Sequence, residues 1–209
     1  MMESHGSTFA RRSRPIARYR ESRAPGPVAS GMRLVILHGY GAMPTSHWFT
    51  WLGDEIGGDV DIPALPDSDA PTRDAWVAAA RQAMAGDDEL VLVGHSLGTV
   101  AALLAVDGVE RARVRGVVLV APFWERVPPL PDLDAFLDLP PIPDLGDLPV
   151  VVIASDDDPI VPPELSARAA ALLGVPVQTV PRGGHFLDRD GWTTLPAARD
   201  AVLGMLAPA

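Results

Sequence analysis

The sequence predicts an α/β protein in which a mostly parallel, doubly wound sheet carries helices on both faces. Two observations lead to this prediction. From Arg33 onward, short β-branched runs alternate with alanine-rich stretches of helical character, the pattern of a parallel sheet covered by helices. The length of 209 residues is enough for one sizeable core and does not require a second. We therefore expect one folded domain over residues 32–209.

The strands and helices of this domain are expected in alternation. Apolar, β-branched runs predict the strands, and alanine-rich stretches predict the helices. One helix is introduced by Pro71 and Thr72, which are typical start signals. In chain order, the expected strands are residues 34–37, 59–62 (the weakest candidate), 90–94, 114–121, 150–154 and 177–180, and the expected helices are residues 46–56, 73–85, 97–107, 163–173 and 194–206.

Residues 1–31 differ from the rest of the chain. They lack apolar periodicity and contain six arginines and two glutamates among several Ser, Gly and Pro residues. This composition predicts a disordered, arginine-rich N-terminal extension, with Met32 as an alternative start. The Arg11-Arg12 pair resembles a twin-arginine export signal, but no apolar stretch of the required length follows it. A cytoplasmic location is therefore expected.

The composition excludes several classes of function. With no cysteine, the chain has no disulfide, no thiolate metal site and no cysteine nucleophile. The net charge of −10 makes the protein a poor partner for nucleic-acid phosphates. The apolar runs are too short to span a bilayer. The expected partner is a small-molecule acyl substrate rather than a nucleic acid or a membrane, and the oligomeric state stays open.

The strongest chemical signal is the segment Gly94-His95-Ser96-Leu97-Gly98, which fits the G-x-S-x-G pattern. It lies between an expected strand and an expected helix, which is the context of a nucleophile elbow. The serine of such an elbow sits on a strained turn, and glycines relieve the crowding around it. The segment therefore predicts Ser96 as a catalytic nucleophile.

A serine hydroxyl needs a base to take its proton, and in this kind of site the chain order is serine, acid, histidine. His185 is the only histidine that follows Ser96, and it lies in a glycine-flanked loop after the last expected strand. His185 is therefore the predicted base. His38 and His95 precede the serine, and we interpret them as hydrogen-bonded structural residues.

The acid is expected between the serine and the histidine, at the end of a strand. The strand 150–154 leads into three adjacent aspartates. Asp158 is favoured because the proline after it holds it extended and the next helix begins shortly afterwards; Asp157 is the alternative. Alternatively, the three aspartates are a solvent-exposed run of charges with no catalytic role. A calcium loop is excluded, because Ala167 stands where a bidentate glutamate is needed.

The surroundings of the site are predicted less sharply. An oxyanion hole needs two backbone donors, which we expect from the amides of Leu97 and Tyr40. Six prolines between Pro122 and Pro149 predict a minimal lid. Aromatic residues near the expected loops either line an acyl pocket or pack in the core. The aromatic residues proposed to bind substrate are Trp48, Phe123, Trp124 and Phe186.

Taken together, these motifs resemble the compact α/β-hydrolases of the retinoblastoma-binding-protein-9 and YdeN-like group, also called the serine hydrolase family. The resemblance extends from about Leu34 to Leu206 and includes His38-Gly39-Tyr40, Ser46-His47-Trp48 and Gly183-Gly184-His185-Phe186. It implies the α/β-hydrolase fold, a triad of Ser96, Asp158 and His185, and no metal or organic cofactor. The cysteine-containing motif through which the animal member binds its partner is absent, so that partnership does not carry over.

The leading functional hypothesis is a carboxylic-ester hydrolase that works through an acyl-enzyme. The same triad is also used by amide or peptide hydrolases and by acyltransferases. A hypothesis of another class is a non-catalytic binding protein on a hydrolase scaffold.

Overall fold

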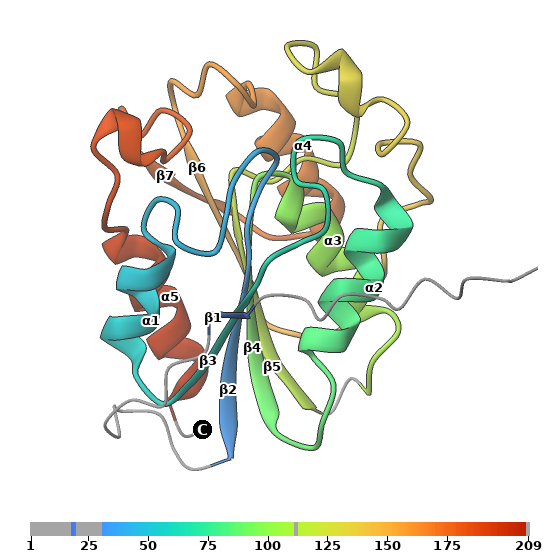
Figure 1. The fold of residues 1–209 in the computed structure, drawn as a ribbon. Helices are drawn as coiled ribbons and strands as arrows, with labels where there is room; N and C mark the ends of the chain where they lie inside the picture. Colours follow the sequence, from blue (N-terminus) through green and yellow to red (C-terminus); the bar gives the residue numbers. More distant parts are fainter. Residues whose placement is uncertain (1–17, 20–30, 111–112, 208–209) are drawn as a thin grey trace, which may run out of the picture.

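A seven-stranded sheet with helices on both faces forms the centre of the computed structural model (Figure 1). The structure describes residues 18–19, 31–110 and 113–207. The strand order is β1-β3-β2-β4-β5-β6-β7. Strands β2 to β7 run parallel, whereas β1 pairs antiparallel with β3 at one edge. This arrangement confirms the predicted fold class.

The boundaries of the elements follow the alternation of the sequence. The strands are β1 (Arg18–Tyr19), β2 (Met32–Leu37), β3 (Asp59–Pro63), β4 (Glu89–His95), β5 (Val114–Val120), β6 (Val150–Ser155) and β7 (Val177–Val180). The helices are α1 (Phe49–Ile56), α2 (Arg73–Ala83), α3 (Leu97–Val106), α4 (Pro163–Leu173) and α5 (Pro196–Leu206), with 3₁₀ turns η2 (Pro131–Leu133) and η3 (Asp188–Asp190). Each predicted strand and helix of the domain is present. Most of the predicted extension, residues 1–31, lies outside the described residues.

The first helix begins later than predicted. It starts at Phe49, not at Ser46. His47 has a φ of 55°, which an α-helix does not contain, and the Ser46 hydroxyl accepts a hydrogen bond from the Met43 amide at 3.0 Å. A turn therefore occupies the residues before the helix. Similarly, α5 begins at Pro196 rather than at residue 194, with the proline in its first turn.

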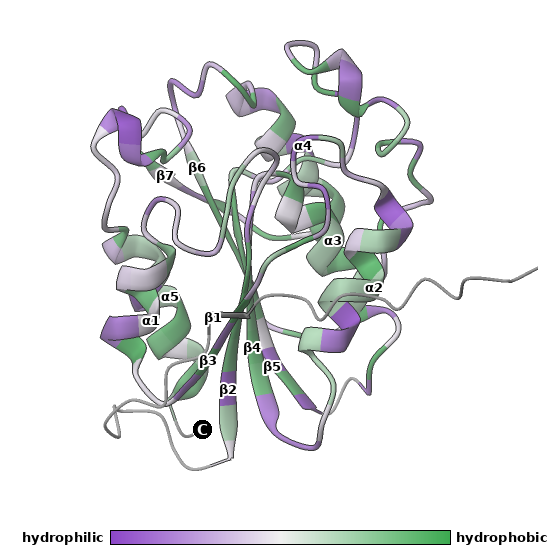
Figure 2. Cartoon of the chain, viewed as in Figure 1, coloured by the Kyte–Doolittle hydropathy of each residue, from purple (hydrophilic) through white to green (hydrophobic). Residues whose placement is uncertain are grey.

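Two apolar layers lie on the two faces of the sheet. Helices α1 and α5 pack on one face, and α2, α3 and α4 pack on the other. Figure 2 shows that hydrophobic residues dominate the strands between these layers. The alternate side chains of a strand point to opposite faces, so the central strands β2, β4, β5 and β6 each contribute to both layers. Such double burial explains why the strand sequences are continuous apolar runs.

The proline-rich segment, residues 122–149, packs mainly beside α2 and α3 rather than over the ends of the strands. Phe136 contacts Trp76 of α2 edge-on, with 5.6 Å between the ring centroids. Leu133, Leu137 and Leu145 are also buried in that layer. Leu130 is the residue through which this segment reaches the pocket described below. The predicted lid is therefore small.

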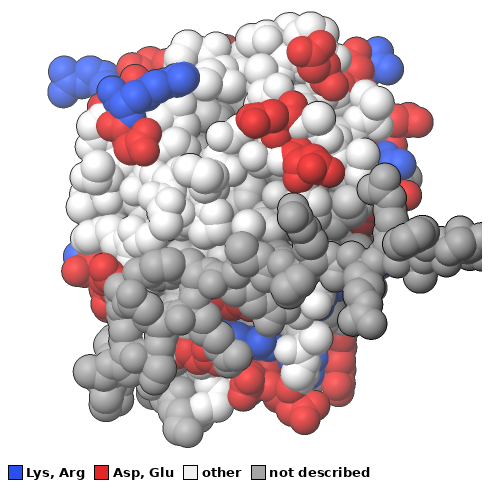
Figure 3. Space-filling view, viewed as in Figure 1, with Lys and Arg blue, Asp and Glu red and all other residues white. Residues whose placement is uncertain are grey.

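The surface carries mostly acidic charge. On the face seen in Figure 3, aspartate and glutamate side chains are more widespread than arginine. None of the helices within the described residues combines the length and the apolar composition needed to cross a membrane.

Candidate active site

Ser96 lies on a strained turn between β4 and α3. Its φ of 54° and ψ of −125° belong to a region that side-chain-bearing residues rarely adopt. The Ser96 amide donates to the Val120 carbonyl at 2.9 Å, and the Thr99 hydroxyl donates to the Ser96 carbonyl at 2.6 Å. These hydrogen bonds from neighbouring elements hold the turn in its unfavourable conformation.

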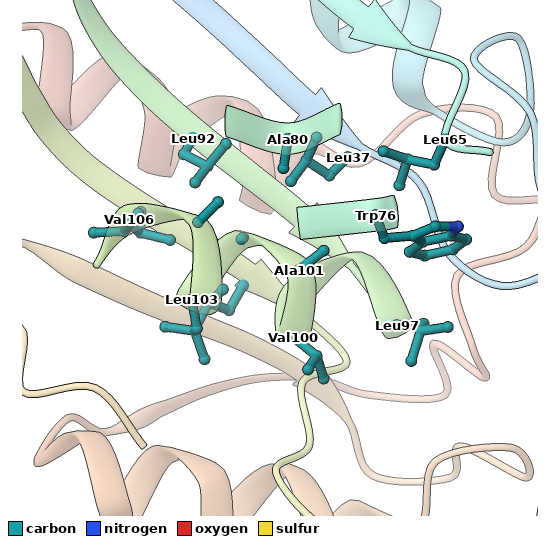
Figure 4. Close-up of a cluster of buried hydrophobic side chains, with 14 of the residues drawn as sticks. Leu37, Leu65, Trp76, Ala80, Leu92, Leu97, Val100, Ala101, Leu103 and Val106 are labelled. Carbon is teal, nitrogen blue, oxygen red and sulfur yellow. The ribbon is translucent and has the colours of Figure 1, made fainter. Parts of the chain in front are cut away.

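The helix that follows Ser96 is rigidly supported. Nine residues of α3 are buried, so this helix is apolar on all sides. In Figure 4, Trp76 and Ala80 of α2 and Leu37 and Leu92 of the sheet lie along one side of it. A serine at the beginning of such a helix has little freedom to move.

The two glycines of the elbow are sterically required. A Cβ atom on Gly94 would lie 2.8 Å from the Gly98 carbonyl oxygen. A Cβ atom on Gly98 would lie 2.3 Å from the Leu37 carbonyl oxygen and 2.5 Å from that of His38. These backbone atoms cannot move without disturbing the sheet. Steric crowding around the serine turn, the predicted reason for the two glycines of G-x-S-x-G, is thus confirmed at both positions.

Gly98→Ala is therefore expected to destabilise the protein by about 3 kcal/mol or more, the upper range of overpacking effects. The matched control is Gly204→Ala in α5, where no atom lies within 4 Å of the added Cβ. That change is expected to stabilise the helix by about 0.5–1 kcal/mol. Urea unfolding of both variants measures the difference. Equal stability of the two variants would contradict the steric argument.

His185 lies in the loop after β7 and is held by Asp158. Its Nδ1 is 2.7 Å from Asp158 Oδ2, and both side chains are buried. The other carboxylate oxygen, Oδ1, accepts the amides of Ile160 at 2.8 Å and Val161 at 2.9 Å. Asp158 is thus oriented by the start of the segment that leads into α4. Of the three adjacent aspartates, it is the one that contacts the His185 ring.

The other two aspartates hold the backbone of the histidine loop. Asp156 accepts the Arg182 amide at 2.7 Å, and Asp157 accepts the Gly184 amide at 2.8 Å. The Ser155 hydroxyl donates to Asp157 at 2.6 Å and accepts the Gly183 amide at 2.9 Å. The hydrogen bond from Ser155, followed by that from Gly184, lowers the pKa of Asp157. Sequence reasoning did not anticipate these contacts, although the polar run itself was visible.

His95 and His38 are hydrogen-bonded structural residues, as predicted. His95 Nε2 lies 3.0 Å from the His185 carbonyl, to which it donates. His38 Nδ1 lies 2.9 Å from the Gly39 carbonyl, and its Nε2 accepts the Leu65 amide at 2.9 Å. A carbonyl only accepts and an amide only donates, so the two partners of His38 define its neutral tautomer, whereas the partner of His95 places a proton on its Nε2. Burial lowers the pKa of His38 and lowers that of His95 further.

Acidification is expected to destabilise the fold because of these two buried histidines. Their folded-state pKa lies below the ordinary value of about 6.5, so below that pH the unfolded chain binds more protons. The free energy of unfolding then falls by up to about 1.4 kcal/mol per pH unit and histidine, until the folded-state pKa is reached. Urea unfolding between pH 7.5 and 5.5 measures this slope. His95→Gln removes one of the two titrating groups and should make the slope shallower. A slope as steep as in the wild type would show that His95 does not contribute to the pH dependence of stability.

The two backbone amides predicted to form an oxyanion hole lie beside Ser96. Leu97 is the first residue of α3, and Tyr40 lies in the turn after β2. Neither amide has a hydrogen-bond acceptor among the described residues. A Cβ atom on Gly39 would lie 3.0 Å from Ser96 Cβ, which shows how closely this turn approaches the serine. Both predicted donors are therefore close to Ser96 and unengaged.

A pocket of about 430 Å³ joins these groups. Ser96 and His185 both line it. Neither Ser96 Oγ nor His185 Nε2 has a hydrogen-bond partner among the described residues, and neither atom is enclosed, so both are open to the pocket. The lining residues are Gly39, Tyr40, Gly41, Ala42, Ser46, His47, His95, Ser96, Leu130, Ile160, His185, Leu187, Asp188 and Arg189.

The four aromatic residues proposed to bind substrate do not line this pocket. Trp48, Phe123 and Phe186 are completely buried in the two apolar layers. Trp124 lies within the proline-rich segment, where its indole N–H donates to the Pro140 carbonyl at 3.0 Å. Packing in the core is favoured because the burial of large apolar side chains contributes most to the stability of the fold. Of the residues that do line the pocket, Leu130, Ile160 and Leu187 carry no sequence pattern that marks them.

Within the described residues, no group of three or more His, Asp or Glu side chains is arranged to hold a metal ion.

Comparison with known sequences identifies similar proteins. A family model described as "Serine hydrolase" matches residues 34–203. YdeN of Bacillus subtilis (strain 168), named as a candidate hydrolase, is 33% identical over 179 residues, which are 81% of this chain and 94% of YdeN.

Solved structures show the same fold. The crystal structure of the ydeN gene product from B. subtilis has a TM-score of 0.70 at 29% identity and covers 85% of this chain and 100% of that chain. A YdeN-like hydrolase from Pectobacterium atrosepticum has a TM-score of 0.66 at 21% identity and covers 85% of this chain and 93% of its own. Est1E from Butyrivibrio proteoclasticus has a TM-score of 0.61 at 19% identity and covers 84% of this chain and 88% of its own. The latter two, at lower identity, support the fold alone.

Proposed function

Since this chain belongs to the serine hydrolase family, we propose that it hydrolyses small carboxylic esters or related acyl compounds. Ser96 is the nucleophile, His185 the general base and Asp158 the acid that orients the base. The observation that carries this proposal is the 2.7 Å contact between His185 Nδ1 and Asp158, in a loop that lines the same pocket as the elbow serine. A carboxylate on one ring nitrogen leaves the other free to accept a proton.

The first half of the proposed reaction forms an acyl-enzyme. His185 Nε2 takes the proton of the Ser96 hydroxyl as Oγ attacks the carbonyl carbon of the ester. The carbonyl oxygen becomes an oxyanion, which accepts hydrogen bonds from the amides of Tyr40 and Leu97. The intermediate then breaks the bond to the alcohol oxygen, and His185 returns its proton to the departing alcohol.

The second half repeats these steps with water. His185 takes a proton from a water molecule, whose oxygen attacks the acyl carbon. The bond to Ser96 Oγ breaks, the serine recovers its proton from His185, and the carboxylic acid leaves. No step requires a metal or an organic cofactor, because each proton and each charge is handled by a named protein group.

No hydrogen bond joins the Ser96 hydroxyl to the His185 ring in this structure. Oγ and Nε2 are both open to the pocket rather than bonded to each other. Such a bond is often long in a free hydrolase and tightens when substrate binds. The structure thus supports a site that completes its alignment in the substrate complex.

The size of the pocket supports small substrates. A space of about 430 Å³ holds a short acyl chain and a small alcohol but not a long polymer within its walls. Amide hydrolysis and acyl transfer use the same groups and differ in the leaving group or in the acceptor. A panel of substrates distinguishes these reactions.

The first test measures reactivity of the nucleophile. A fluorophosphonate probe should label the wild-type protein at Ser96 and leave the Ser96→Ala variant unlabelled. Absence of labelling in the wild type would favour a binding protein on a hydrolase scaffold.

The second test compares p-nitrophenyl esters of increasing acyl length with the matching anilides. We expect turnover of the short esters, a decline beyond the length that the pocket accommodates, and slower turnover of the anilides. Faster cleavage of the anilides would instead indicate an amidase. Transfer of the acyl group to an added alcohol in preference to water would indicate an acyltransferase.

A further inference from the structure

His47 forms a second histidine–aspartate contact at the pocket, separate from the pair of Asp158 and His185. The Asp188 amide donates to His47 Nδ1 at 3.1 Å, and Asp188 Oδ1 lies 3.3 Å from the same nitrogen. Both residues line the pocket. The proposed reaction assigns no role to this contact, although His47 belongs to the Ser46-His47-Trp48 segment that the sequence singled out.

The partners of His47 determine where its proton is. A backbone amide can only donate, so Nδ1 accepts the hydrogen bond from Asp188. A ring with a proton on Nδ1, charged or neutral, would instead donate to the Asp188 carboxylate, but the hydrogen bond at this nitrogen comes from the Asp188 amide. Burial, the largest influence, lowers the pKa of His47 despite the opposing effect of Asp188. The ring is therefore neutral at pH 7 and carries its proton on Nε2.

The Nε2–H group of His47 is available to a ligand. Among the described residues it has no hydrogen-bond partner, and it is not enclosed by protein atoms. The ring is held by edge contacts with Phe49 and His95, at centroid distances of 5.4 Å and 5.6 Å. Only 12% of the side chain is exposed, so the orientation of the ring is well defined.

The backbone of His47 is also strained. Its φ of 55° lies in the left-handed region, which is unfavourable for a residue with a side chain. The turn nevertheless places an imidazole in the wall of the pocket. Strained residues that the surrounding structure holds in place are concentrated at functional sites.

We propose that His47 is a specificity-determining residue whose Nε2–H donates a hydrogen bond to an acceptor oxygen of the substrate close to the scissile carbonyl. The favoured substrates are then esters with an ether, hydroxyl or carbonyl oxygen near the reacting bond, rather than esters of plain alkyl chains. This inference rests on the proposed function.

The chemistry of the pocket explains the expected preference. Leu130, Ile160 and Leu187 supply apolar walls. A plain alkyl group bound against them would cover the Nε2–H without giving it an acceptor, which costs free energy. A substrate with a correctly placed oxygen avoids that cost. A site with a polar group of this kind discriminates against the analogue that lacks the matching atom.

Two substitutions separate the two ring nitrogens. His47→Asn retains an oxygen acceptor near the position of Nδ1 and loses the donor at Nε2. His47→Gln retains an amide donor near the position of Nε2 and loses the acceptor near Nδ1. If His47 only anchors the Asp188 loop, asparagine is the better replacement. If it binds substrate, glutamine is the better one.

The substrates are matched pairs in which one CH₂ group is replaced by oxygen. On the acyl side, p-nitrophenyl methoxyacetate is compared with p-nitrophenyl butyrate. On the alcohol side, 2-methoxyethyl acetate is compared with butyl acetate. The ratio of kcat/KM within a pair is compared between variants, because the intrinsic reactivity of each ester is then the same and cancels.

We expect His47→Asn to reduce the oxygen-to-carbon selectivity of at least one pair by about five- to tenfold, the scale of one neutral hydrogen bond. His47→Gln should retain most of that selectivity. The pair that responds identifies the side of the scissile bond on which His47 acts. Unchanged selectivity in both pairs, or equal loss of activity toward all four esters in both variants, would overturn the inference.

Fluorophosphonate labelling separates failure of this inference from failure of the proposed function. An inference that fails alone leaves a wild-type protein that is labelled at Ser96 and turns over esters without the His47-dependent selectivity. A wild-type protein that is neither labelled nor active would overturn the proposed function, and this inference with it.

Discussion

Ser96→Ala is expected to lower kcat for ester hydrolysis by on the order of 10⁶-fold, the scale of removing the nucleophile from a triad protease. Alanine cannot form the acyl-enzyme, whereas the pocket and the two amide donors remain. Stopped assays with p-nitrophenyl acetate at high enzyme concentration measure the residual rate. KM, where turnover is measurable, should change little, because the hydroxyl contributes more to the reaction than to binding.

The same position offers a test of backbone strain. The φ of 54° is unfavourable for serine and alanine alike but not for glycine. Ser96→Ala should therefore unfold at nearly the same urea concentration as the wild type, whereas Ser96→Gly should be at least as stable as Ser96→Ala. Turnover by either variant at a rate comparable to the wild type would remove Ser96 as the nucleophile.

Asp158→Asn is expected to lower kcat by on the order of 10⁴-fold, as the equivalent change does in a serine protease. Asparagine retains the shape of the side chain but can present an N–H group to His185 Nδ1, which is now 2.7 Å from a carboxylate oxygen. The ring would then adopt the tautomer with its proton on the nitrogen that faces Ser96. Initial rates on a short p-nitrophenyl ester measure the loss.

Asp156→Asn and Asp157→Asn are the matched controls, and each is expected to lose less than about tenfold. Both side chains accept backbone amides of the histidine loop, and an asparagine oxygen can accept the same bonds. Neither contacts the His185 ring. If Asp157→Asn shows the large loss of kcat and Asp158→Asn retains nearly wild-type kcat, the acid is assigned to the wrong residue. If all three variants are active, the acid lies outside this loop.

The order of strands and helices was predictable because it depends on local patterns. Each buried strand requires a continuous apolar run, and each covering helix requires good helix formers, so both appear in the sequence. The start of α1 was the clearest error. It depends on the left-handed conformation of His47, which is stabilised by contact with Asp188, a residue 141 positions away.

The elbow was also readable, because its glycines are demanded by backbone atoms nearby. Gly94 faces the beginning of α3, and Gly98 faces the end of β2. A steric requirement that leaves room for only one residue type is visible as a motif. The choice among three adjacent aspartates has no such steric signature. It was argued from the proline after Asp158, and in the structure that residue contacts His185.

The sequence by itself determined the α/β architecture and the strained serine turn, and it was the basis for the proposed order of nucleophile, acid and base. Each depends on positions where physical constraints leave few alternative residue types. Only the tertiary structure decided what lines the pocket. The aromatic residues were drawn into the core, where their large apolar surfaces are fully covered, and Leu130, Ile160 and His47 came to the pocket instead. The availability of His47 Nε2 likewise depends on a contact between two distant loops, which no local pattern encodes.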